Sequence, residues 1–70
     1  MDPAAQFGEN LRRLRLAAGL TQEALSDATQ LNTSEISRLE RGVRNPRLHT
    51  MLRVARGLGV PLAALLTDIE

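Results

Sequence analysis

Residues 33–41 combine hydroxyl and guanidinium side chains at helical spacing. Four of these residues recur at i, i+3, i+4 and i+7 and so share one stripe of a helix: Ser34, Ser37, Arg38 and Arg41. Arginine carries five N–H donors in a planar fork that matches the acceptors of guanine and of phosphate. Ile36 and Leu39 lie on the opposite side of the helix, which should face a core. The stripe has the chemistry to read DNA base edges, although a solvated polar face would fit the same pattern.

The flanking residues predict a second short helix before this one. Thr21 suits the N-cap of the earlier helix, whose free N–H groups beside Gln22 can bind a phosphate. Asn32 followed three residues later by Glu35 resembles a capping box and marks the start of the later helix. A loop with two more arginines follows at residues 43–47. We therefore expect two short helices joined by a tight turn, with the second able to enter the major groove.

Helical periodicity covers the rest of the chain. We expect helices over about residues 4–18 and 47–58 and a last one that begins with Pro61 at its first position. Gly-apolar pairs suitable for ending helices occur three times, at Gly19-Leu20, Gly42-Val43 and Gly59-Val60. The expected inward residues of the second, fourth and fifth helices are Leu25, Ala28, Leu48, Met51, Leu52, Ala55, Leu58, Leu62 and Leu65. No alternating strand pattern exists, so we predict one all-α domain over residues 1–70, with five helices and a core within residues 7–66.

The composition excludes several classes of protein. The net charge is +1, but residues 31–56 carry +4, which suggests a side that faces a polyanion. The chain has no cysteine, one histidine and one aromatic residue, so we expect no metal site, no cofactor and no platform for stacking single-stranded bases. No catalytic constellation and no small-molecule site is evident. No apolar run approaches the roughly 20 residues of a membrane span, and no secretory signal precedes the first helix, so we expect a cytoplasmic protein.

Several of these fragments occur together at a specific spacing. They are Leu11-Arg12-Arg13-Leu14-Arg15, Gly19-Leu20-Thr21-Gln22, Ile36-Ser37-Arg38-Leu39-Glu40-Arg41-Gly42, Asn45-Pro46 and Leu58-Gly59-Val60. The combination resembles the Cro/C1-type (Xre) helix-turn-helix family of phage repressors over nearly the whole chain. The chain length also resembles that of the controller proteins of restriction–modification systems. The resemblance implies a lambda-repressor-like fold whose second and third helices form the helix-turn-helix.

The resemblance also implies roles for particular residues. Base contacts would come from Thr33, Ser34, Ser37 and Arg38, and phosphate contacts from Gln22, Arg41, Arg44, Asn45 and Arg47. Arg15 and Glu40 match the family's partly buried ion pair. A residue-level argument agrees, because an acid at a helix C-terminus opposes the macrodipole and needs a cation. The chain departs from the family at the turn, where Gln30 replaces the usual glycine and Thr29 a small apolar residue. This departure leaves the tilt of the recognition helix open.

We therefore expect a transcriptional regulator that binds double-stranded DNA as a homodimer on a pseudo-palindromic operator. Leu62 and Leu65 should close the core, whereas Leu66 and Ile69 should stay on the surface and form the dimer interface through the fifth helix. The alternative is an antitoxin-type interaction module that neutralises a partner protein. An enzyme is the least favoured class.

Overall fold

The helix starts follow from side chains that accept free backbone N–H groups. Oδ2 of Asp2 accepts from Ala4 N at 3.0 Å and Ala5 N at 3.3 Å, so the first helix begins at Pro3, one residue earlier than expected. Oγ1 of Thr21 accepts from Ala24 N at 3.0 Å, and Oδ1 of Asn32 accepts from Glu35 N at 2.7 Å. The predicted N-caps at Thr21 and Asn32 are confirmed.

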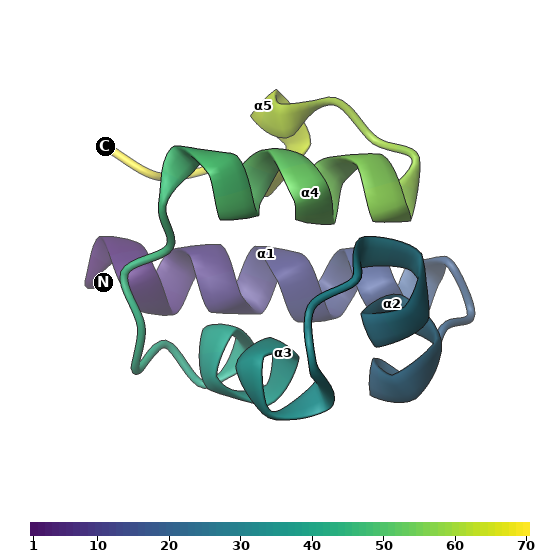
Figure 1. The fold of residues 1–70 in the computed structure, drawn as a ribbon. Helices are drawn as coiled ribbons and strands as arrows, with labels where there is room; N and C mark the ends of the chain where they lie inside the picture. The colour runs from purple at the N-terminus through teal and green to yellow at the C-terminus, as the bar shows by residue number, and fades with distance from the viewer.

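The computed structural model describes all residues from 1 to 70 and contains five helices and no strand (Figure 1). The helices are α1 (Pro3–Ala17), α2 (Gln22–Thr29), α3 (Thr33–Glu40), α4 (Leu48–Leu58) and α5 (Leu62–Leu65). The all-α fold with five helices is confirmed. Pro61 is the N-cap of α5 rather than its first helical residue, which corrects the expected start by one position.

Helix α1 is the longest helix and lies between two others. It packs against α3 on one side and α5 on the other, while α2 packs against both α3 and α4 (Figure 1). The core takes one or two side chains from each helix: Phe7, Leu11, Leu25, Ile36, Leu39, Val54, Ala55 and Leu65. In Figure 1 the two ends of the chain lie at the same end of α1. None of the helices combines the length and the apolar character that crossing a lipid bilayer requires.

Two expected inward positions are wrong. Leu48 is 60% exposed because it is the first residue of α4 and helical side chains lean toward the N-terminus, off the end of the helix. On α2 the buried residues are Leu25 and Thr29, which are four positions apart and share one face, and Ala28 is exposed to solvent. Val54 is fully buried and was not among the expected core residues.

Two glycines allow helices to approach closely. A Cβ on Gly8 would collide with the backbone carbonyl oxygens of Leu39 and Glu40, at the end of α3. A Cβ on Gly57 would lie 2.5 Å from Cγ2 of Thr29, where α4 crosses the end of α2. Both contacts fix the position of the helix-turn-helix relative to α1 and α4, so larger residues here would displace it.

Candidate nucleic-acid interface

The turn between α2 and α3 keeps a left-handed residue although it lacks glycine. Gln30 has φ 63° and ψ 20°, a conformation that costs an ordinary residue about 1–2 kcal/mol. Hydrogen bonds from the neighbouring side chains hold the turn. The hydroxyl of Thr29 donates to Leu25 O at 2.8 Å and accepts from Leu31 N at 3.3 Å, and the hydroxyl of Ser26 donates to Leu31 O. The turn therefore tolerates Gln30 without losing its left-handed geometry.

Helix α3 has one buried apolar face and one accessible polar face. Ile36 and Leu39 are fully buried against the core. On the other side Thr33 and Ser34 are exposed, and Ser37 and Arg38 are half-buried. The hydroxyl of Ser34 donates to Oδ1 of Asn32 at 2.8 Å, so its oxygen can still accept a hydrogen bond from a ligand. The expected base-reading residues share one accessible face of the helix.

Four arginines surround this face without an intramolecular partner. Arg38 and Arg41 belong to the end of α3, and Arg44 and Arg47 to the loop that follows it; the single ion pair of the molecule involves none of them. Asn45 is also exposed in this loop. Cations gathered at one end of a helix and in the loop after it create a positive potential that attracts a polyanion such as DNA.

Arg15 and Glu40 form that single ion pair, at the junction of α1 and α3. Nε and Nη2 of Arg15 donate to Oε2 and Oε1 of Glu40 at 2.5 and 3.0 Å, a bidentate arrangement. The two side chains are only 9% and 5% exposed. The hydrogen bond to Glu40 raises the pKa of Arg15 above its ordinary value, against the opposing effect of burial. The guanidinium therefore stays charged at any physiological pH.

Both members of the ion pair also form hydrogen bonds at the start of α2. Nη1 of Arg15 donates to Leu20 O at 2.9 Å, and Nε2 of Gln22 donates to Oε1 of Glu40 at 3.2 Å. The junction thus joins α1, the turn before α2, α2 itself and the end of α3. Gln22, an expected phosphate contact, is half-buried and has one of its two amide hydrogens on Glu40. The other amide hydrogen remains available to a ligand.

The expected dimer residues lie at the other end of the chain, away from α3. Leu66 is 37% exposed, in agreement with the expectation. Ile69 is partly buried and packs against the core, so the expectation that it stays on the surface is wrong in part. The reason is that the chain folds back after α5 through a left-handed residue, Asp68, with φ 64°.

One structurally important polar residue escaped sequence analysis. Asn10, on α1, is 2% exposed and uses its side-chain amide to bind the backbone at Leu65 and Thr67. An asparagine within a helix reads as a surface residue when the distant segment that it contacts is unknown. No group of three or more His, Asp or Glu side chains is placed to bind a metal ion.

Comparisons with known proteins agree with this geometry. The model of the HTH_3 helix-turn-helix family matches residues 11–65. An uncharacterised HTH-type transcriptional regulator, y4dJ of Sinorhizobium fredii, is 40% identical over 70 residues, which cover all of this chain and 91% of that protein. The control protein C.MunI of a Mycoplasma species is 34% identical over 99% of this chain and 95% of its own length.

A solved structure extends the likeness to three dimensions. The restriction–modification controller protein C.AhdI of Aeromonas hydrophila superposes with a TM-score of 0.86 at 39% identity, over 89% of this chain and 94% of that one. The family and these relatives are transcriptional regulators rather than enzymes. With its matching helix-turn-helix and its unpaired arginines around α3, this chain belongs to the Cro/C1-type (Xre) helix-turn-helix family of DNA-binding transcriptional regulators.

Proposed function

We propose that this protein regulates transcription by binding a pseudo-palindromic operator in double-stranded DNA as a homodimer, with α3 in the major groove. One observation carries the proposal: α3 is fully buried along Ile36 and Leu39, while its other face holds polar side chains and unpaired arginines. A helix with that division suits insertion into the groove, because its core face is already satisfied.

Direct reading of sequence falls to the exposed face of α3. Arg38 is suited to a bidentate contact with guanine, since no other side chain engages its guanidinium. Thr33, Ser34 and Ser37 can accept from or donate to neighbouring base edges. Five residues around the helix supply sequence-independent affinity through phosphate: Gln22, Arg41, Arg44, Asn45 and Arg47. The phosphate contacts set the register of the helix, and the base contacts discriminate between sequences.

A second copy of the chain is the proposed occupant of the surface at Leu66. This side chain borders a shallow groove of about 220 Å³ whose lining is largely apolar. Its walls also include Ile69 and two residues of the loop that carries the phosphate contacts, Asn45 and Pro46. A two-fold operator requires a self-complementary interface. An interface next to this loop would position both copies of α3 relative to one another.

Selection of bound duplexes from a random pool tests the DNA-binding proposal. We expect an inverted repeat with half-sites about one helical turn apart. Affinity for the selected duplex should fall steeply with salt concentration, because each neutralised phosphate releases counterions. Failure to enrich any sequence, together with salt-independent binding, would favour the interaction-module alternative.

Sedimentation tests the proposed interface. The Leu66→Glu variant should be a folded monomer with weaker and less cooperative operator binding, because a carboxylate cannot be buried without a partner. Leu16→Glu is the matched control, since Leu16 is 54% exposed on α1 and outside this groove. A wild-type chain that is monomeric at tens of micromolar, or a Leu66→Glu variant that remains dimeric, would contradict this interface.

A further inference from the structure

The end of the chain has little secondary structure of its own. Helix α5 contains four residues, a single turn, and helices this short are unstable in isolation. Beyond it the backbone makes only short-range bonds, from Leu66 N to Ala63 O and from Ile69 N to Leu66 O, both at 3.1 Å. Asp68 adopts a left-handed conformation that an aspartate does not favour strongly. Its position therefore depends on contacts with the rest of the fold, which include the burial of Leu65 and the packing of Ile69 against the core.

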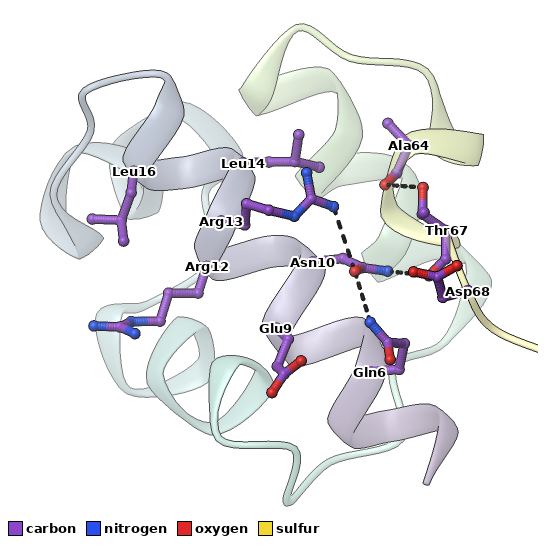
Figure 2. A pocket seen from close by; sticks show the side chains of 10 residues that line it. All are labelled: Gln6, Glu9, Asn10, Arg12, Arg13, Leu14, Leu16, Ala64, Thr67 and Asp68. Carbon is purple, nitrogen blue, oxygen red and sulfur yellow. Dashed lines mark hydrogen bonds between the residues drawn. The ribbon is translucent and has the colours of Figure 1, made fainter. Parts of the chain in front are cut away.

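The side chain of Asn10 connects this segment to α1 by hydrogen bonds. Its Nδ2 group donates to Leu65 O and to Thr67 O, both at 2.8 Å, across more than fifty residues of sequence. Its Oδ1 accepts from Nε2 of Gln6 at 3.0 Å, and from Nη2 of Arg13 at 3.5 Å, as Figure 2 shows. Both amide hydrogens and both acceptor positions are therefore used by a residue that is 2% exposed.

The two carbonyl groups that Asn10 binds lie on either side of Leu66. These bonds hold the peptide before Leu66 and the peptide after Thr67, and Leu66 O between them accepts from Ile69 N. Together they restrict the direction of the Leu66 side chain, because rotation of either held peptide would break a hydrogen bond to a buried amide. Leu66 is the exposed apolar side chain of this segment, and Ile69 then folds back onto the core. Asn10 thus acts together with the buried Leu65 and the partly buried Ile69 in directing Leu66 outward.

We propose that Asn10 is a positioning residue for dimer formation: it orients Leu66 toward the second copy of the chain by holding the backbone on both sides of it. The inference rests on the proposed dimer interface. Because association is favoured by surfaces that are already ordered, loss of this contact should weaken the dimer by restoring freedom to the segment. The DNA-reading face of α3 is formed by other contacts and should remain intact.

Sedimentation equilibrium of the full chain tests the proposal. We expect Asn10→Ala to raise the dimer dissociation constant by about tenfold or more. Affinity for a duplex with a single half-site should stay within about twofold, since one protomer binds it without a partner. Gln6→Ala is the matched control, because Gln6 contacts Oδ1 of Asn10 but neither the Leu65 nor the Thr67 carbonyl. The dimer dissociation constant of this variant should stay within about twofold of the wild-type value.

Amide hydrogen exchange in the wild-type protein gives a second test that does not depend on the variant folding. The amides of Leu66 and Ile69 should exchange more than about tenfold more slowly than in an unstructured peptide. Free exchange at both positions would overturn the proposal, as would a folded Asn10→Ala variant that dimerises like the wild type. A monomeric wild-type chain would overturn the interface itself, whereas a dimeric wild type unaffected by Asn10→Ala would overturn only the positioning role.

Discussion

The junction around Arg15 and the face around Arg38 use the same side chain in opposite ways. Arg15 is buried, bidentate to Glu40 and bonded to a backbone carbonyl. Arg38 lies half-buried on α3 without an ion-pair partner. The difference arises from the neighbours rather than from the residue type, since Glu40 lies within hydrogen-bond distance of Arg15 and no acid forms an ion pair with Arg38. The comparison separates charge that stabilises the fold from charge that remains available to DNA.

Breaking the junction should have the largest effect on stability. We expect Arg15→Ala to lower the free energy of unfolding by about 2–4 kcal/mol, because it leaves the carboxylate of Glu40 buried without its cation. Urea denaturation measures this loss. The matched control is Arg12→Ala, since Arg12 is exposed on the same helix and should change stability by about 0.5 kcal/mol or less.

The double variant Arg15→Ala/Glu40→Ala sharpens this test. It should recover part of the loss, because no unpaired charge remains buried. A coupling energy below about 0.3 kcal/mol would show that the two sites act independently. A change of pH around neutrality cannot replace these substitutions, because Arg15 stays charged there. The raised pKa of Arg15 means that its contribution to stability is present below the ordinary pKa of arginine and is lost only as pH rises through the raised value.

On the reading face, Arg38→Ala should affect binding instead of folding. We expect specific affinity to fall by about 1–3 kcal/mol and the preference at one base pair per half-site to relax. The free energy of unfolding should change by about 0.5 kcal/mol or less, since Arg38 has no ion-pair partner to lose. Titration of the selected operator and of duplexes altered at single positions provides the measurement. An equal loss on every duplex would refute a base-reading role for Arg38.

Arg47→Ala should weaken binding without changing specificity. Arg47 is exposed at the N-cap of α4, in the loop rather than on the α3 stripe. We expect similar losses for specific and non-specific duplexes and a salt slope smaller by about one. Affinities measured across a series of salt concentrations test this. A loss confined to the selected operator would move Arg47 from the phosphate contacts to the base contacts.

The smallest expected effect is at the turn between α2 and α3. Gln30→Gly should stabilise the fold by about 0.5–1 kcal/mol, because glycine adopts the left-handed conformation without strain but loses more entropy on folding. Operator affinity should not change, since the backbone already has φ 63°. Thermal unfolding and operator titration measure the two quantities. A gain in affinity would indicate that Gln30 alters the tilt of the recognition helix.

The sequence was sufficient for the helices and for the front and back of α3. Local rules operate within a few residues: Thr21 and Asn32 cap the helices that follow them, and Ile36 and Leu39 share one helical face. The position of the turn between α2 and α3 could be located from sequence, but the backbone conformation of Gln30 within it could not. Whether Gln30 would take this conformation depended on hydrogen bonds from Thr29 and Ser26 to neighbouring backbone.

Only the tertiary structure decided how the distant segments meet. The exposure of Leu48 depends on where α4 begins, the burial of Val54 on how α4 packs, and the return of Ile69 to the core on the turn at Asp68. The role of Asn10 depends on carbonyl groups more than fifty residues away. A hydrogen-bonding side chain specifies its own capacity but not its partner, because backbone carbonyls are chemically alike at every position. Sequence therefore determined which groups could bind, and packing determined which of them were used within the fold and which remain exposed.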